Sequence, residues 1–163
     1  MVRYDVATDD AEIARLVSES DARTVILDVE PFVTHWGSPD ATFDARVASS
    51  LKIFGSMERR PDVVLFATNS RRRWREPIKV SGSLSIRYVS TACKPFRLNL
   101  YQDLPRPGVV VGDQIATDGL LAARLGYHFI HYKPADIATP LGPHLMRWLG
   151  YPFERFYFRR ATN

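Results

Sequence analysis

The sequence predicts an α/β fold with three layers, in which helices cover both faces of a parallel sheet. Three observations support this prediction: short apolar segments of strand length, helical patterns between them, and polar residues directly after several strands. Apolar strands that alternate with helices are typical of parallel sheets, which are buried on both faces. Ligands bind such sheets outside the carboxyl ends of the strands, so the residues that follow the strands are candidates for a functional site.

The first part of the chain contains two predicted helices around one strand. Thr8 is the expected N-cap of a helix that reaches about Ser18. Its apolar face consists of Ile13, Leu16 and Val17. The β-branched and aliphatic segment 24–28 is the first strand. A second helix is expected over about 42–56, with Gly55 as its stop. Four apolar residues recur in it at helical spacing: Phe43, Val47, Leu51 and Phe54.

The second part of the chain supplies the remaining strands. The segment DVVLFATNS (62–70) is a second buried strand that ends in polar residues, and IRYVSTACKP (86–95) is a weaker third strand. The segment GVVVGDQIATDGLLAARLGYHFIHY (108–132) contains a fourth strand, a helix that ends at Gly126, and a fifth strand. His128 and His131 flank this fifth strand, and we expect them to be packing or edge residues.

Length and composition indicate one globular domain over residues 1–163, because 45% of the residues are hydrophobic and 25% are charged. The longest apolar runs are much shorter than the roughly 20 residues that span a bilayer. The N-terminal segment lacks the apolar core of a signal peptide. A single cysteine, Cys93, excludes an internal disulfide and a cysteine-based zinc site, and we expect it to be buried. These features predict a cytoplasmic protein.

The net charge is +4, and only four of the 22 basic residues are lysine. Arginine suits bidentate contacts to phosphate or carboxylate better than lysine does. This preference fits a phosphorylated ligand, nucleic acid or an anionic lipid surface. A codon bias of the genome explains it equally well, and we favour that explanation for most of these arginines.

Polar residues follow four of the predicted strands. They are Asp28 and Glu30 after the first strand, Thr68 and Asn69 after the second, Lys94 after the third, and Asp113 after the fourth, with Asp118 close by. Because the carboxyl ends of parallel strands meet at one edge of the sheet, we expect these side chains to converge there. Taken singly, Lys94 could be a surface lysine, Asp118 an acid in the first turn of a helix, and Thr68-Asn69 a turn.

The chemistry of this set favours a phosphoryl-binding site. Carboxylates from two strands repel each other unless a cation lies between them, and ligand sets made only of oxygen favour Mg²⁺. The Thr68 hydroxyl and the Lys94 ammonium supply donors for an anion, so charge neutralisation and positioning could carry catalysis. An aspartate in such a place can attack phosphorus and form an aspartyl-phosphate.

Four stretches resemble motifs of the haloacid dehalogenase-like (HAD) superfamily of phosphatases, and within it the subfamily IIIA, YqeG-like proteins. The stretch VVVGDQIATDGLLAARLGY looks like that family's Gly-Asp-Gln-x-x-Thr-Asp signature, LFATNS is similar to its second motif, and CKP to its Lys-Pro motif. Trp36 stands where the first motif has a tryptophan. The resemblance covers about residues 24 to 135 and implies a capless, Rossmann-like (HAD-like) fold.

The resemblance also implies a role for each residue. Asp28 would be the nucleophile and a ligand of Mg²⁺. Glu30 would give the metal a backbone carbonyl, and its side chain would be the general acid and base. The remaining roles would be phosphoryl binding by Thr68 and Asn69, stabilisation of the aspartyl-phosphate by Lys94, and completion of the metal site by Asp113 and Asp118.

The first motif departs from the family pattern Asp-x-Asp-x-Thr, because this chain has Asp28-Val29-Glu30-Pro31-Phe32. Glutamate moves the carboxylate outward by one methylene, and a misplacement of about 1 Å can cost on the order of 10²-fold in rate. Two interpretations follow: an active Mg²⁺-dependent phosphatase that uses Glu30, or an impaired binding or scaffold protein that still binds Mg²⁺ and phosphate. The retained Asp28, Lys94, Asp113 and Asp118 favour activity.

The segments between the motifs are too short for a cap domain, which predicts an open site. An open site suits a large or lipid-borne phosphomonoester at a membrane surface, or a lid from a second copy of the chain. Some YqeG-like relatives act on phosphatidylglycerophosphate. We expect no integral membrane segment, and no nucleic acid as a partner, because no RNA-binding motif is present.

Two basic or aromatic segments have open roles. Residues Arg71–Arg75 are either a basic rim that steers an anionic substrate or a solvated loop. The C-terminal tail could contact a membrane or a second copy, but we expect packing against the domain. Its packing residues would be Leu145, Trp148, Phe153 and Phe156.

Overall fold

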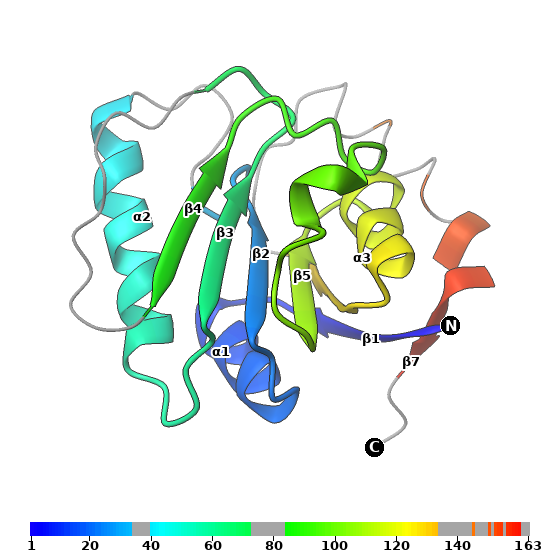
Figure 1. Cartoon of the computed structure of the whole chain (residues 1–163), viewed down its shortest axis with the longest axis horizontal. Coiled ribbons are helices and arrows are strands. Elements are labelled where there is room, and N and C mark those ends of the chain that lie inside the picture. Colours follow the sequence, from blue (N-terminus) through cyan, green and yellow to red (C-terminus); the bar gives the residue numbers. More distant parts are fainter. Residues whose placement is uncertain are drawn as a thin grey trace.

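The predicted parallel sheet is present in the computed structural model, which describes residues 1–33, 40–72, 84–133, 145, 150, 152–154 and 156–160. Its seven strands are all parallel and follow the order β4-β3-β2-β5-β6-β1-β7 (Figure 1). The strands are β1 (Val2–Ala7), β2 (Thr24–Asp28), β3 (Val63–Ala67), β4 (Ser85–Val89), β5 (Gly108–Gly112), β6 (His128–Tyr132) and β7 (Phe158–Arg160). The α/β class predicted from the sequence is thus confirmed.

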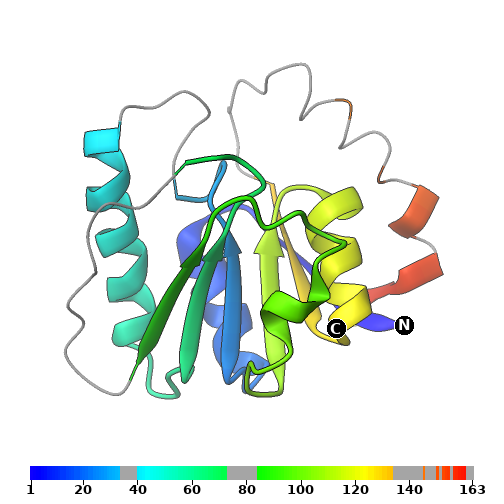
Figure 2. The same ribbon diagram turned by 45° about the horizontal axis from the view of Figure 1, so that its top comes forward.

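Helices cover both faces of the sheet, which gives three layers. The helices are α1 (Asp10–Glu19), α2 (Asp40–Gly55) and α3 (Leu120–Leu125), with a 3₁₀ turn η1 (Leu98–Tyr101) and a π-helical turn η2 (Ile115–Gly119). Alternate residues of β2 pack on opposite faces: Val25 joins the core beneath α1 and α2, and Ile26 joins the core beneath α3. Figure 2 shows α1 and α3 on opposite sides of the sheet.

The central strands β2, β3 and β5 are buried at every residue. This double burial explains their continuous apolar sequences. The edge strand β4 is only partly buried, and it ends at Val89. The predicted third strand is therefore too long, and Lys94 lies in a loop beyond the sheet.

The predicted helices are confirmed, with one change at the first cap. Asp9 is the N-cap of α1, because its side chain accepts a hydrogen bond from the Glu12 N–H at 2.8 Å. Thr8 instead donates its backbone N–H to the Glu12 carboxylate at 2.9 Å. At its C-terminus α3 ends at Gly126, whose φ of 69° is the left-handed conformation that glycine adopts at low cost.

Two strands were not predicted. β1 contains Arg3 and Asp5, so it lacks the continuous apolar pattern of the central strands, yet it pairs with both β6 and β7. β7 forms only through this distant pairing, and its Phe158 packs against Tyr4 and Phe129.

The predicted packing of the tail is wrong for the three of its residues that the structure describes. Leu145, Phe153 and Phe156 are exposed, and Phe158 is buried in their place. Trp148 lies outside the described residues, as do Trp36 and residues 73–75 of the predicted basic rim.

The fold leaves the carboxyl edge of the sheet without a cap in the part of the chain that the structure describes. There, α2 is the only element between β2 and β3, and no element lies between β3 and β4. Among the same residues, no helix combines the length and apolar character needed to cross a bilayer.

Candidate active site

The candidate site lies where the direction of sheet winding reverses. After β2 the chain continues to β3 and β4 on one side, whereas β5 and β6 lie on the other side. Parallel sheets bind ligands at such a reversal, because the connections on either side leave a crevice at the carboxyl ends of the strands. Asp28 is the last residue of β2 and Asp113 directly follows β5. The topology therefore brings together two acids that are far apart in the sequence.

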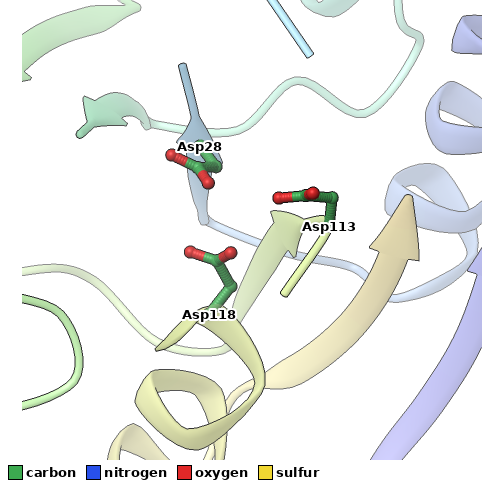
Figure 3. A group of neighbouring side chains, drawn as sticks. All are labelled: Asp28, Asp113 and Asp118. Carbon is green, nitrogen blue, oxygen red and sulfur yellow. The ribbon is translucent and has the colours of Figure 1, made fainter. Parts of the chain in front are cut away.

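Three buried carboxylates meet at this point. Ligand oxygens of Asp28, Asp113 and Asp118 all lie within 4.8 Å of one another, and their side chains converge in Figure 3. Asp118 comes from the π-helical turn η2, and its backbone N–H donates to the Gln114 carbonyl at 2.8 Å. Single π-helical turns are frequent at functional sites because they redirect one side chain from the regular helical spacing.

Gly112, the last residue of β5, must be a glycine because Asp118 approaches its Cα closely. A Cβ atom at Gly112 would lie 2.3 Å from Cγ of Asp118, which is closer than real Cβ atoms come to any neighbour. The Gly-Asp pair of the sequence motif thus has a steric reason: the glycine leaves the space that the second acid of the motif fills.

Lys94 is buried between two of these acids. Its Nζ lies 2.8 Å from Oδ1 of Asp28 and 2.7 Å from Oδ1 of Asp118, and it donates to the Ala67 carbonyl at 2.9 Å. An ammonium has three N–H donors, so these three contacts use all of them. The alternative of a surface lysine is therefore wrong. We call Asp28, Lys94, Asp113 and Asp118 the floor of the site.

The loop that carries Lys94 is held by Asn69. The Asn69 Oδ1 accepts the Lys94 backbone N–H at 2.7 Å, and the Asn69 Nδ2 donates to the Lys94 carbonyl at 3.2 Å. Thr91 and Cys93 in this loop have φ values of 52° and 48°, a conformation unfavourable for residues with a side chain. Asn69 thus clamps the backbone of a strained loop, and its predicted contact with phosphate stays a prediction.

The electrostatics of the floor favour an added cation. Burial, together with Asp118 and Asp113, raises the pKa of Asp28 well above its usual value although Lys94 lowers it. Burial alone would lower the pKa of Lys94, but Asp118 and Asp28 outweigh it and raise this pKa, so the ammonium stays charged. One lysine cannot balance three carboxylates. The donor set contains only oxygen, so it could hold a hard divalent ion such as Mg²⁺.

Glu30 lies apart from the three clustered acids. Its Oε2 accepts a hydrogen bond from the Thr68 hydroxyl at 2.7 Å, its Oε1 accepts one from the Ser70 hydroxyl at 3.4 Å, and the same Oε1 lies 3.8 Å from Nε of Arg72. We call Glu30, Thr68, Ser70 and Arg72 the mouth of the site. The predicted acid and the predicted phosphoryl-binding hydroxyl are therefore neighbours.

Two residues of the floor, Asp28 and Lys94, and all four of the mouth line an open cavity of about 340 Å³. This volume suits a small ligand group. The cavity is lined by Asp28, Glu30, Thr68, Asn69, Ser70, Arg72, Lys94, Gln114 and Thr117. Of these, Arg72 belongs to the predicted basic rim, whereas sequence reasoning missed Ser70, Gln114 and Thr117, although each lies within four residues of a predicted site residue.

Two further sequence predictions need correction. Cys93 is exposed, not buried. His128 and His131 lie within β6 and do not flank it. His131 Nε2 lies 3.1 Å from the Asp113 carbonyl and its Nδ1 lies 2.8 Å from the Tyr4 hydroxyl. Because a carbonyl only accepts, Nε2 donates and Nδ1 accepts from Tyr4, so His131 helps to hold the Asp113 backbone.

Neither protein-family models, nor curated proteins, nor solved structures match this chain. The function is therefore inferred from the site itself. Its residues could neutralise a divalent cation, present a carboxylate for attack on phosphorus, and hold a second carboxylate near a hydroxyl donor.

Proposed function

We propose that this protein is a Mg²⁺-dependent phosphomonoester hydrolase of the HAD type that acts through an aspartyl-phosphate on Asp28. The observation that carries the proposal is the floor of the site. A buried ammonium bridges Asp28 and Asp118 at 2.8 and 2.7 Å, with Asp113 in the same cluster. A purely structural role does not explain this cluster, because burying several charges destabilises a fold unless ligands or partners compensate for the lost hydration.

The metal would be held by the side chains of Asp28, Asp113 and Asp118, with the backbone carbonyl of Glu30 as a further ligand. When bound, Mg²⁺ neutralises the carboxylates and the phosphoryl oxygens. With all four groups ionised, as a bound cation would favour, the formal charges of Asp28, Asp113, Asp118 and Lys94 sum to −2, which matches one divalent cation.

In the first chemical step, Asp28 attacks the phosphorus. Lys94 holds Oδ1 of Asp28, so Oδ2 is the attacking oxygen. A bond forms between this oxygen and phosphorus while the ester P–O bond breaks, and Glu30 gives its proton to the departing alkoxide. The Thr68 hydroxyl, which donates to Glu30 at 2.7 Å, turns to a phosphoryl oxygen when substrate enters.

In the second step, water attacks the aspartyl-phosphate. The ionised Glu30 takes a proton from this water, the bond between phosphorus and Asp28 breaks, and inorganic phosphate leaves. Glu30 thus acts as an acid in the first step and as a base in the second, so the enzyme returns to its starting state. Lys94 stabilises the Asp28 carboxylate as it departs.

The substrate of this hydrolase is a phosphorylated molecule that reaches an uncapped site. We propose a cytoplasmic protein that takes a large or lipid-borne phosphomonoester, with peripheral membrane contact or a second copy of the chain closing the site. The absence of a cap between β2 and β4 in the described residues supports this proposal.

One observation favours a second candidate function. The Glu30 carboxylate is already engaged by Thr68 and lies 3.8 Å from Arg72, and it stands one methylene farther from the backbone than the family's aspartate. An acid held in this way could be unable to reach the leaving group. The second candidate is therefore a binding or scaffold protein that holds Mg²⁺ and phosphate without turnover.

The test is a phosphatase assay with Mg²⁺ on a panel of phosphomonoesters, with Asp28→Asn as the matched variant. We expect metal-dependent release of phosphate, a loss of at least about 10³-fold in Asp28→Asn, and a phosphorylated Asp28 in mass spectra of quenched wild-type enzyme. Absence of turnover on every ester, with Mn²⁺ binding intact by electron paramagnetic resonance, would support the second candidate.

A further inference from the structure

We propose that Arg72 determines specificity by binding a second anionic group, a carboxylate or a phosphate, close to the ester oxygen on the leaving group. This inference rests on the proposed function and adds the class of substrate. Arg72 lies in the same cavity as Asp28, but at the mouth of the site, where the leaving group must depart.

Arg72 lies beside Glu30, the proposed acid, and so close to the place of the leaving group. Its Nε lies 3.8 Å from the Glu30 Oε1. If Glu30 gives its proton to the leaving oxygen, then the groups attached to that oxygen lie beside Glu30, and therefore within reach of the guanidinium. The distance of 3.8 Å is longer than a hydrogen bond, so a ligand oxygen can approach the guanidinium without breaking a hydrogen bond between Nε and the Glu30 Oε1.

Lys94 is the other cation among the described residues that line the cavity, and its ammonium holds the floor together. All three donors of Lys94 bind Asp28, Asp118 and the Ala67 carbonyl. A guanidinium has five N–H donors in a planar fork, which matches the two oxygens of a carboxylate or phosphate. The Arg72 guanidinium therefore has the geometry needed to bind a second anion in this cavity.

Arg72 is also held in place before any ligand arrives. Its guanidinium carbon lies 5.8 Å from the ring centre of Phe43, which is a buried residue of α2. Its backbone carbonyl accepts from the Tyr88 hydroxyl at 2.8 Å, and its backbone N–H donates to the Ser70 hydroxyl at 3.3 Å. Contacts from α2, β4 and the loop after β3 thus fix one side of the mouth, which lowers the entropic cost of binding an anion there.

The alternative is that Arg72 only balances the charge of Glu30. In that case its removal would affect all phosphomonoesters by the same factor. Under the proposal, removal would affect only esters that carry a second anion near the ester oxygen. The two explanations therefore differ in the ratio between substrates, and not in the rate on any one of them.

The experiment compares four esters with two-carbon leaving groups in the presence of Mg²⁺. They are 2-hydroxyethyl phosphate (neutral), phosphoglycolate (carboxylate), 1,2-ethanediol bisphosphate (phosphate) and phosphoethanolamine (cation). We expect kcat/KM of wild type to be roughly 10- to 100-fold higher for at least one anionic ester than for the neutral one, and lowest for the cationic one. The better of the two anionic esters identifies which anion the mouth of the site binds.

Three variants then test the residue. Arg72→Met is expected to bring the ratio of anionic to neutral ester close to one, and Arg72→Lys to keep part of it, because lysine retains the charge but not the fork. The neighbouring Arg71 is exposed and does not line the cavity, so Arg71→Met should keep the wild-type ratio. A ratio near one in wild type, or a ratio unchanged in Arg72→Met, would overturn the proposal.

A binding measurement separates this inference from the proposed hydrolase. The same esters are titrated calorimetrically into Asp28→Asn and into Asp28→Asn combined with Arg72→Met. A preference for the anionic esters that disappears with Arg72 supports the anion site even if wild type shows no turnover. Equal affinities for the neutral and anionic esters in Asp28→Asn would refute it.

Discussion

The floor and the mouth of the site differ in how their charges are held. At the floor, Lys94 and Asp118 have side chains that are 2% and 0% exposed, and their charged atoms are 2.7 Å apart. At the mouth, Glu30 and Arg72 are 11% and 14% exposed, and their nearest charged atoms are 3.8 Å apart. The Lys94–Asp118 pair of the floor is thus almost completely buried and in close contact, whereas the Glu30–Arg72 pair of the mouth is partly exposed and more widely spaced.

Because of this difference, substitutions at the floor and at the mouth should have different effects on folding stability and on turnover. Removal of one partner at the floor leaves a buried charge without compensation, so it should lower both folding stability and turnover. Removal of a charge at the mouth leaves groups that water can solvate, so it should affect turnover alone. The following variants test this distinction.

Lys94→Met should have the largest effect. We expect turnover to fall at least about 10³-fold and the free energy of unfolding of the metal-free protein to fall by about 3 kcal/mol, because Asp28 and Asp118 lose their shared ammonium. Phosphate release and urea unfolding measure the two effects. Lys52→Met, at an exposed position of α2, is the control and should change neither. Wild-type stability in Lys94→Met would show that the floor does not need its cation.

Glu30→Gln should lower turnover strongly but leave the stability of the fold nearly unchanged. We expect kcat to fall roughly 10²- to 10⁴-fold, as for loss of a general acid, while the free energy of unfolding changes by less than about 1 kcal/mol. Glu30→Asp keeps a carboxylate but shortens its reach, so it should retain more activity than Glu30→Gln. Equal kcat values in wild type and Glu30→Gln would remove Glu30 from the mechanism.

Gly112→Ala tests whether metal binding depends on the position of Asp118 at the floor. The added methyl group would lie 2.3 Å from Cγ of Asp118 and must displace it. We expect the affinity for Mn²⁺ to fall roughly 10- to 100-fold, with a loss of about 1–3 kcal/mol in stability. Titration calorimetry gives the affinity. Gly55→Ala is the matched control, since nothing lies within 4 Å of its Cβ, and it should bind Mn²⁺ as wild type does.

His128 should give the smallest effect, at the opposite end of β6 from the site. Burial lowers its pKa below the usual 6.5, although Asp5, whose Oδ2 lies 2.7 Å away, raises it. The folded state therefore binds fewer protons than the unfolded state. Its contribution to stability is complete above pH 6.5 and is lost as the pH falls through the lower, folded pKa.

The measurement is urea unfolding of wild type and His128→Gln between pH 7.5 and 5. Wild type should lose up to about 1 kcal/mol more than the variant over this range. Parallel stability curves would mean that His128 has the same pKa in both states. The turnover of the variant at pH 7.5 should equal that of wild type, because His128 lies outside the cavity.

The sequence predicts a strand well where the residues of that segment alone identify it, without knowledge of its neighbours in the sheet. β2, β3 and β5 are buried on both faces, so they require continuous apolar residues that are visible without any partner. The helix α2 likewise shows its buried face through the spacing of its apolar residues. By contrast, β1 and β7 are half-polar segments: β1 is a strand because it pairs with β6 and β7, and β7 because it pairs with β1.

The same distinction holds for the site. The acids at strand ends predicted the floor, because parallel topology brings all carboxyl ends of strands to one edge. The predicted basic rim Arg71–Arg75 includes Arg72, but the sequence could not distinguish Arg72 from its neighbours, since its position depends on Phe43 from α2 and on Glu30 from the loop after β2. The engagement of Asn69 with the Lys94 backbone was missed for the same reason.

The sequence by itself determined the α/β class, the order of the main strands and helices, and the residues that gather at the edge of the sheet. These features depend on hydrophobic periodicity and on residue types at strand ends, which are local properties. Only the tertiary structure decided how the charges are paired and which side chains hold them. Such contacts join residues as distant as Tyr4 and His131, which are 127 positions apart, and distances of this kind are fixed by the packing of the whole domain.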